Sequence, residues 1–305
     1  MLRINIHEML ITISGIFRNN QSYIQWLTNT LTNIEQLYQN EHRFEYCFYE
    51  NDSTDQTQTL LNSFMKTRNG IFTSEQHPKS HIKPMIGRGN EKSRTTDRTH
   101  SLAEYRNMCF AKSKPLKSEW TLIIDSDIYF DEHIIANFVE HVEKYSNDGF
   151  VMYTANTVDS SGLYFDTWAY KDTRNVYLTR EYLIQKYGKD GARIHSDIAV
   201  DRQCWNDGKP ISVNSAFGGC AFIESVILNE CSWSAPIGCE HWEFCRMVRE
   251  CNGGKGKIGV CPTIKCVNRE SPSNVKRKMT KQMLKEQICK SKTKRQKAKQ
   301  ITSKK

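Results

Sequence analysis

The sequence predicts an α/β protein whose mainly parallel sheet is flanked by helices. Along the first half of the chain, short β-rich apolar runs alternate with segments in which apolar residues recur every three or four positions. The 305 residues include 38% hydrophobic and 25% charged side chains, a composition typical of a globular protein with a sizeable core. The same composition excludes a wholly disordered chain.

The first half supplies the predicted sheet in chain order. Residues 8–17 are apolar and β-rich, which predicts a strand. The spacing predicts a helix over 23–38, with one apolar face made of Ile24, Leu27, Leu31, Ile34 and Leu37. The remaining elements expected in this half are a strand at 44–49, a helix at 57–65, a helix at 101–112, a strand at 120–124, a helix at 133–145 and a strand at 150–153.

Two regions give weaker patterns. Residues 69–99 lack apolar periodicity and contain several Gly and Pro, so we expect a long functional loop there. The second half is less regular. It predicts short strands near 196–205 and 211–223, a helix over 239–251 and a last strand near 257–261.

The charge of the chain is concentrated at its C-terminal end. The net charge is +9, yet residues 275–305 contain thirteen Lys or Arg against Glu286 alone, which gives this segment +12 and leaves −3 for residues 1–274. We therefore expect a body over 1–274 and a basic, disordered tail over 275–305 that can contact an anionic membrane or another polyanion. The mildly acidic body gives no sign of a specific nucleic-acid site.

Export, membrane and cysteine signals agree with a protein of the cytoplasm or of a membrane surface. No run of 18 apolar residues exists, and polar residues interrupt the first 17, so neither a transmembrane segment nor a signal peptide is expected. Seven of the eleven cysteines lie between Cys220 and Cys266 without the C-x₂-C spacing of a zinc ribbon. Buried, reduced thiols are therefore favoured over disulfides, and a structural zinc site comes third.

Two acidic clusters follow predicted strands, at Glu50-Asn51-Asp52 and at Asp125-Ser126-Asp127. Ligands bind at the carboxyl ends of the strands in an open parallel sheet. Carboxylates two residues apart at such an end can hold one Mn²⁺ or Mg²⁺, which commonly bridges to a substrate phosphate. A solvated acidic turn is the alternative interpretation of each cluster.

Other phosphate-handling classes lack their motifs. No Gly-x-Gly-x-x-Gly follows the first strand, and the match at Gly254, Gly256 and Gly259 leads from a helix into a strand, which disfavours a dinucleotide-binding enzyme. The P-loop and the Gly-x-Ser-x-Gly motif are also missing. A nucleotide-sugar site is the leading option that remains.

Several segments resemble glycosyltransferases of the GT-A type. Residues 50–57 and 102–107, followed by the Asp-Ser-Asp strand, are similar to motifs of that group. The motifs around Tyr164–Trp168, Cys204–Asn206, Phe217–Phe222 and Cys239–Trp242 narrow the resemblance to the capsule-associated α-1,3-mannosyltransferases of the cryptococcal type. It covers roughly residues 8–265. It implies a GT-A-like (Rossmann-like) fold, with a nucleotide-sugar half over 1–155 and an acceptor half over 156–274.

The resemblance also implies roles for individual residues. Asp125 and Asp127 would hold Mn²⁺ or Mg²⁺ against the diphosphate of the donor, with His241, the last His of the chain, as the third ligand. Substrate contacts are expected from Glu50, Asp52, Arg98, Arg106, Gly218 and Gly219. The catalytic candidate is Glu240, which would deprotonate the acceptor hydroxyl in an inverting enzyme or orient the substrate in a retaining one. Asp166 and Asp172 are weaker candidates for acceptor contacts.

The expected activity is therefore the metal-dependent transfer of a hexose from a nucleotide sugar to a glycan or protein acceptor, with GDP-mannose as the leading donor. A UDP-hexose galactosyl- or glucosyltransferase is the alternative among transferases. A non-enzymatic protein that binds polyanions through its tail is the alternative from another class, and a metal nuclease is a third.

Overall fold

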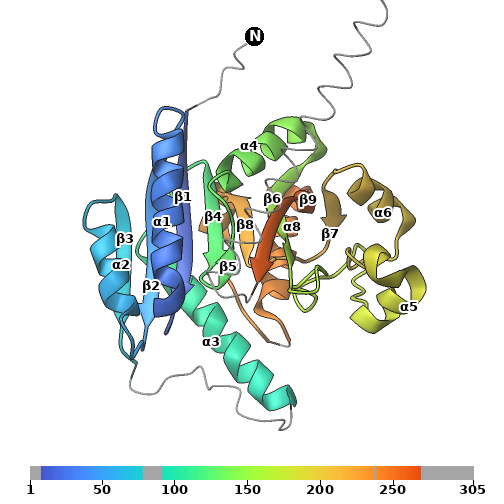
Figure 1. Cartoon of the computed structure of the whole chain (residues 1–305), viewed down its shortest axis with the longest axis horizontal. Helices are drawn as coiled ribbons and strands as arrows, with labels where there is room; N and C mark the ends of the chain where they lie inside the picture. Colours follow the sequence, from blue (N-terminus) through green and yellow to red (C-terminus); the bar gives the residue numbers. More distant parts are fainter. Residues whose placement is uncertain (1–7, 78–90, 237, 269–305) are drawn as a thin grey trace, which may run out of the picture. The chain divides into compact units, whose positions relative to one another are not determined.

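A central sheet organises the described part of the chain, which comprises residues 8–77, 91–236 and 238–268 of this computed structural model (Figure 1). Its strands are β1 (Met9–Phe17), β2 (His42–Asn51), β3 (Gly70–Glu75), β4 (Trp120–Asp125), β5 (Ile128–Tyr129), β6 (Phe150–Val158), β7 (Ile211–Val213), β8 (Cys220–Glu224) and β9 (Lys257–Asn268). Their order is β3-β2-β1-β4-β8-β6-β9-β5, and β7 pairs with β9. The first four of these are mutually parallel, β8 runs antiparallel to both its neighbours, and β6 pairs parallel with β9. The predicted α/β class with a mostly parallel sheet is confirmed.

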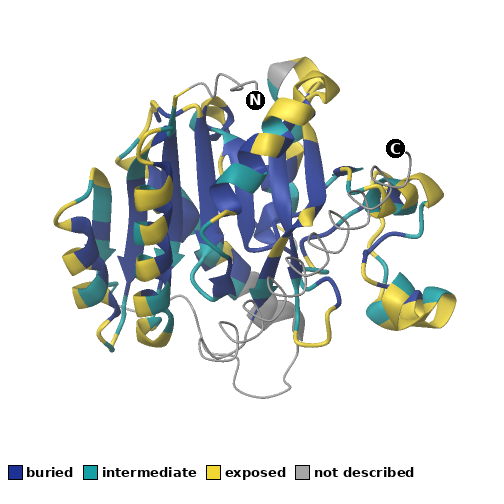
Figure 2. Cartoon of the chain, turned by 45° about the horizontal axis from the view of Figure 1, so that its top comes forward, coloured by how far each residue is buried: buried dark blue, intermediate teal, exposed yellow. Residues whose placement is uncertain are grey.

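Helices cover both faces of this sheet. They are α1 (Gln21–Tyr38), α2 (Thr57–Met65), α3 (Glu91–Ala111), α4 (Ile134–Lys144), α5 (Arg180–Gly191), α6 (Ala199–Asn206), α7 (Ser225–Glu230) and α8 (Glu240–Gly254), with a short 3-10 helix at Ser146–Asp148. Apolar residues of α1, α2 and α4 pack in one cluster on one face of the sheet, and those of α3, α7 and α8 pack in a second cluster on the other. Figure 2 shows that the strands between them are largely buried, whereas α5 and α6 form an exposed lobe.

Helix α1 illustrates how the apolar spacing decides packing. Ile24, Leu27, Leu31 and Ile34 are all buried, as the spacing predicts. The prediction is wrong for Leu37, which is 48% exposed. Tyr38 occupies the buried position at the end of the helix instead.

Three predictions in the less regular regions are corrected by the structure. Residues 199–206 form helix α6 rather than a strand, because Asp201 in its first turn accepts a hydrogen bond from Ser196 Oγ and the apolar Val200 points to solvent. The expected strand at 211–223 is two strands, since Gly218 and Gly219 break it with positive φ angles. The expected loop at 69–99 contains the edge strand β3, which pairs with β2, and the first turns of α3.

The cysteines, the helices and the predicted domain boundaries can also be compared with the sequence analysis. All ten cysteines of the described residues are free thiols, eight of them buried. None of the helices in this part of the chain is both long and apolar enough to cross a membrane. The tail predicted over 275–305 lies outside the described residues. The predicted boundary at residue 155 falls within β6, and the division into a donor half and an acceptor half stays a prediction.

Candidate active site

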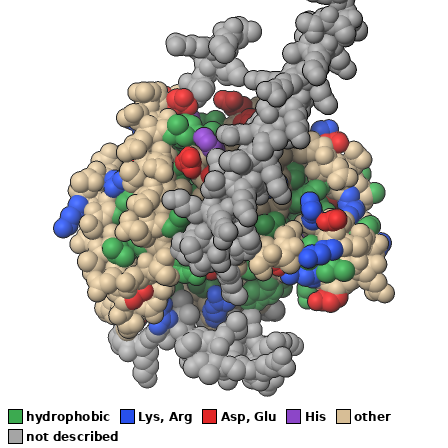
Figure 3. Space-filling model, viewed as in Figure 1, with side chains coloured by type: hydrophobic (Ala, Val, Ile, Leu, Met, Phe, Trp, Pro, Cys, Tyr) green, Lys and Arg blue, Asp and Glu red, His purple; other side chains and the backbone are tan. Residues whose placement is uncertain are grey.

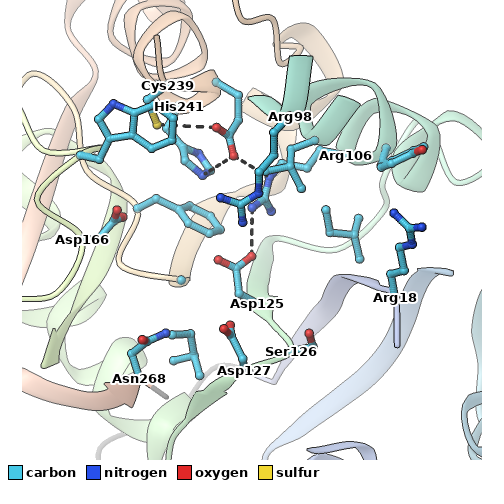
Figure 4. A pocket seen from close by; sticks show the side chains of 18 of the residues that line it. Arg18, Arg98, Arg106, Asp125, Ser126, Asp127, Asp166, Cys239, His241 and Asn268 are labelled. Atoms are coloured by element: carbon cyan, nitrogen blue, oxygen red, sulfur yellow. Dashed lines mark hydrogen bonds and ion pairs between the residues drawn. The ribbon is translucent and has the colours of Figure 1, made fainter. Parts of the chain in front are cut away.

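A pocket of about 500 Å³ opens at the carboxyl ends of β1 and β4. The parallel register brings these ends together, because Ile16 of β1 lies opposite Asp125 of β4. Much of its lining comes from residues 16–18 at the end of β1, residues 125–128 at the end of β4, the loop at 165–168 and residues 239–241 at the start of α8. Residues of α3 between Arg98 and Arg106 form a further wall. Figure 4 shows the side chains that converge there.

The Asp-Ser-Asp segment forms one side of this pocket. Asp125 is the last residue of β4, and its backbone N–H donates to Gly219 O at 2.8 Å. Asp127 lies two residues further on, in the turn that leads to β5. Both carboxylates line the pocket, and Figure 4 shows them facing its interior from the same edge of the sheet. The acidic cluster therefore lies at the carboxyl end of a strand and beside a pocket, and its role as a metal site stays a prediction.

Arg106 joins two of the acidic side chains. Its Nη2 donates to Asp125 Oδ1 at 2.9 Å, and its Nε lies 3.8 Å from Glu240 Oε1. The guanidinium is almost fully buried and lies over the Phe217 ring, 4.7 Å from its centroid. Burial disfavours the charged form, but Asp125 and Glu240 outweigh it and raise the pKa of Arg106 above its ordinary value. Arg106, which the sequence predicts to contact the diphosphate of the donor, is thus held by the carboxylates of Asp125 and Glu240.

Glu240 and His241 begin helix α8 and are both buried. Burial raises the pKa of the Glu240 carboxyl, and Arg106 opposes this shift. His241 stacks on Phe217 with ring centroids 4.0 Å apart, and its Nε2 lies 3.4 Å from Glu240 Oε1. Burial, followed by the charge of Arg106, lowers the pKa of His241 far below its ordinary value, so the imidazole is neutral.

The three expected metal ligands line the same pocket without forming one ligand group. Within the part of the chain that the structure describes, no three His, Cys, Asp or Glu side chains converge as a metal site would require. Figure 4 shows His241 beside Arg106 and away from Asp127. The paired carboxylates are therefore the part of the predicted set that the fold brings together.

The other acidic cluster has a different arrangement. Glu50 is fully buried and accepts hydrogen bonds from Ser53 N–H and Ser74 Oγ. Asp52 has a φ of 51° and accepts from His77 N–H at 2.7 Å. Neither residue lines the pocket, whereas Asn51 between them does. The two carboxylates hold the turn after β2, and the Asn51 amide donates to Asp52 Oδ2 at 2.9 Å.

Gly218 and Gly219 directly precede β8, and Gly219 lies beside Asp125. Both have positive φ angles, 69° and 65°. Gly219 lines the pocket, where a Cβ would lie 2.4 Å from Ile128 Cγ1 and 3.3 Å from Asp125 Oδ2. Gly218 does not line it, but its N–H donates to Asp166 Oδ2 at 2.7 Å. Glycine at 219 thus leaves space beside the free edge of the Asp125 carboxylate.

We expect Gly219→Ala to destabilise the protein by about 2 kcal/mol, because it adds left-handed strain to a clash with Ile128. Urea denaturation measures this change. Gly162→Ala is the matched control: Gly162 has a φ of 77°, and a Cβ added there would meet nothing within 4 Å, so the control isolates the strain. Equal losses in both variants would contradict a clash at position 219.

Asp166 is a stronger site residue than the sequence indicates. It lines the pocket and accepts N–H groups from Gly218 and, at 3.4 Å, from Ala169. Burial, with Asp125 and Glu240 adding to it, raises the pKa of Asp166 to about 6. Arg98 also lines the pocket, from α3 rather than from a loop, and is half-buried. Arg18, Phe217 and Asn268 are pocket residues that sequence reasoning missed, because only the tertiary fold brings them together.

The raised pKa of Asp166 predicts a pH dependence of stability. A carboxyl whose folded pKa lies near 6, against 3.8 in the unfolded chain, contributes stability below about pH 4 that is lost as the pH rises through 6. We expect Asp166→Asn to be more stable than the wild type by about 1–2 kcal/mol at pH 7.5 and not at pH 4. Urea denaturation at both pH values tests this, with exposed Asp190→Asn as the charge-matched control. Parallel pH profiles for wild type and Asp166→Asn would refute it.

Comparison with known proteins identifies the family. The profile described as Cryptococcal mannosyltransferase 1 matches residues 10–253. Among curated proteins no sequence matches. Among solved structures, S. aureus TarS is similar with a TM-score of 0.50 at 14% identity, over 87% of this chain and 37% of that one. GalNAc-T7 with UDP, GalNAc and Mn²⁺ has a TM-score of 0.49 at 12% identity, over 88% of this chain and 45% of that one.

The likeness to TarS supports the fold alone. The chain spans 37–60% of the length of the first three solved structures that it matches, which are all of TarS. The family profile, in contrast, covers most of the chain and includes the strand that ends at Asp125 and the start of α8. The chain belongs to the cryptococcal mannosyltransferase family of glycosyltransferases and has the GT-A type of fold.

Proposed function

We propose that this glycosyltransferase is metal-dependent and transfers mannose from GDP-mannose to a hydroxyl group of a glycan or protein acceptor. The observation that carries the proposal is the pair of carboxylates, Asp125 and Asp127, at the carboxyl end of β4 in the pocket. The family supports mannose as the transferred sugar.

The donor set suits a hard divalent cation. Asp125 and Asp127 offer carboxylate oxygens, which are the ligands that Mn²⁺ and Mg²⁺ prefer. Arg106 holds Asp125 Oδ1, and the missing side chain of Gly219 keeps the space beside Oδ2 open. A cation bound there would supply charge neutralisation for the departing nucleoside diphosphate. His241 is proposed as a further ligand because its imidazole is neutral and its buried Nδ1 makes no hydrogen bond within the described residues. It does not converge with the two carboxylates in this structure, so the proposal requires it to approach them when the metal binds.

The other proposed roles follow from position and charge. Arg18 and Arg98 line the pocket and are proposed to bind the phosphates of the donor. Arg106 is proposed to support phosphate binding indirectly, because it holds the Asp125 carboxylate in place. Glu240 is proposed to act on the acceptor hydroxyl, since burial raises the pKa of its carboxyl toward the range of a general base. The anomeric configuration of the product, read by NMR, separates its two roles: inversion requires a base, and retention leaves Glu240 to orient the acceptor.

A thermal-shift panel tests the donor and the metal together. GDP-mannose, UDP-glucose, UDP-galactose and UDP-N-acetylglucosamine are each added with and without Mn²⁺. A ligand that binds only the native state adds about 2.7 kcal/mol of stability at 100 times its dissociation constant. We expect a stabilising shift with GDP-mannose and Mn²⁺ together that is larger than the sum of their separate shifts.

Other outcomes of the panel have clear meanings. A metal-dependent shift with a UDP-hexose alone would replace GDP-mannose as the donor and keep the rest of the proposal. A well-folded sample that responds to none of the four donors would refute the proposed activity. The proposed membrane contact of residues 275–305 is tested separately, by flotation with phosphatidylserine vesicles, and binding that survives removal of these residues would contradict it.

A further inference from the structure

Two cysteine sulfurs meet between the end of α7 and helix α8. Cys231 directly follows α7, and Cys251 lies near the end of α8. Their Sγ atoms are 3.3 Å apart, although the two residues are 20 positions apart along the chain. A disulfide bond is about 2.0 Å long, so the two sulfurs need to approach each other by only about 1.3 Å to form one.

Access from solvent distinguishes this pair from another pair of thiols. Cys47 and Cys109 have Sγ atoms 3.8 Å apart, but both residues are buried. Each of these thiols also donates to the backbone carbonyl of the other residue, at 2.8 Å from Cys47 and 3.1 Å from Cys109. Cys251, in contrast, is partly exposed, while Cys231 is 1% exposed. An external oxidant can therefore reach one sulfur of the Cys231–Cys251 pair and neither sulfur of the other pair.

The backbone around Cys231 is held in place. Lys114 Nζ donates to Cys231 O at 3.3 Å. Two residues further on, Trp233 N–H donates to Asn107 Oδ1, and Trp233 O accepts from Asn107 Nδ2, both at 2.8 Å. The Trp233 ring stacks on Phe244 of α8 with centroids 3.9 Å apart. These contacts keep the segment against α8, which favours a bond within the molecule over a bond between two molecules.

We propose that Cys231 and Cys251 are a redox site, at which a small disulfide such as glutathione disulfide oxidises the two thiols to an intramolecular disulfide bond. The bond would tie the end of α7 to the helix that begins at Glu240. This inference concerns the covalent chemistry of the chain and does not depend on the proposed sugar transfer.

The reaction balances in two thiol–disulfide exchanges. The partly exposed Cys251 sulfur attacks glutathione disulfide, which gives a mixed disulfide at Cys251 and releases one glutathione. Burial raises the pKa of the Cys231 thiol to about 12, so Cys231 is not the first to react. Its sulfur then attacks the Cys251 sulfur and releases the second glutathione. The two protein thiols lose two hydrogen atoms, and the two glutathione molecules gain them.

Disulfide mapping tests the proposal. Reduced protein is incubated with equal concentrations of reduced and oxidised glutathione, its remaining thiols are alkylated in denaturant, and its peptides are analysed by mass spectrometry without reduction. We expect a cross-linked peptide that joins Cys231 to Cys251, with Cys47 and Cys109 alkylated. No cross-linked peptide, a glutathione adduct that persists on Cys251, or equal oxidation of the Cys47–Cys109 pair would overturn the inference.

Thermal denaturation provides a second measurement. Because the bond closes a loop of about 20 residues, the oxidised protein should have a Tm at least about 5 °C above that of the reduced protein. Cys231→Ala and Cys251→Ser should abolish this rise. Cys204→Ser is the matched control and should keep it, because Cys204 is also partly exposed but has no hydrogen-bonded sulfur neighbour among the described residues.

Each variant is compared between its own oxidised and reduced states, so any loss of stability from the substitution itself cancels. If Cys231→Ala fails to fold, Cys251→Ser at the partly exposed position still decides the question. A rise in Tm that persists in Cys251→Ser, or an equal Tm for the two states of the wild type, would refute the proposed bond.

Discussion

Replacing Asp127 by Asn is expected to reduce sugar transfer by at least about a thousandfold, which corresponds to about 4 kcal/mol of transition-state stabilisation. The substitution keeps the size of the side chain and removes the negative charge that a divalent cation needs. Asp127 lies in the turn between β4 and β5 and is partly exposed, so we expect the free energy of unfolding to change by only about 0.5 kcal/mol. Initial rates at saturating GDP-mannose and Mn²⁺ measure the loss.

A second measurement assigns this loss to the metal. Titration of Mn²⁺ in the presence of GDP, followed by electron paramagnetic resonance, should show at least tenfold weaker binding to Asp127→Asn. Asp148→Asn is the control, because it makes the same charge change at an exposed residue outside the pocket. A variant at position 127 that kept a tenth of the activity, or the wild-type affinity for Mn²⁺, would remove Asp127 from the proposed ligands.

The elements of the first half could be predicted because their signals are local. In α1 the buried residues recur at helical spacing, and in β4 an apolar run ends at the first acidic residue. Such patterns reflect the burial of one face or of a whole strand, so they survive in the sequence. The edge strand β3 gives no such signal, because only pairing with β2 makes it a strand.

The site could be predicted only in part, because only some of its residues lie in segments with a local signal. Asp125, Asp127, Glu240 and His241 all line the pocket, as the position of their segments at element ends suggests. Glu50 does not, because successive side chains of a strand point in opposite directions and the motif does not say which residue faces the ligand. The partners of Arg106 could not be predicted either, since they are 19 and 134 positions away along the chain.

Arg106→Met should cause the largest loss of stability among the changes considered. The guanidinium is 5% exposed and lies against Asp125 and Glu240, so its removal leaves two carboxylates without their shared cation. Breaking a buried ion pair from one side costs about 3–5 kcal/mol, and we expect a loss in this range at pH 7.5 from urea denaturation. Arg246→Met is the matched control: Arg246 is 47% exposed and pairs with Glu243 and Glu250 on the surface of α8, where about 1 kcal/mol or less is expected.

The loss of stability in Arg106→Met should also depend on pH, because Glu240 gains a proton as the pH falls. Burial already raises the folded pKa of Glu240 above its unfolded value of 4.5, and loss of the nearby guanidinium raises it further. A group with a raised folded pKa destabilises the protein as the pH rises through that value, and no longer does so below the unfolded pKa. The difference between wild type and Arg106→Met should therefore shrink as the pH falls from 7.5 toward 4.5, and the double variant Arg106→Met/Glu240→Gln should recover part of the loss at pH 7.5. A difference that stayed constant with pH would mean that lost packing over Phe217, rather than uncompensated charge, accounts for the role of Arg106.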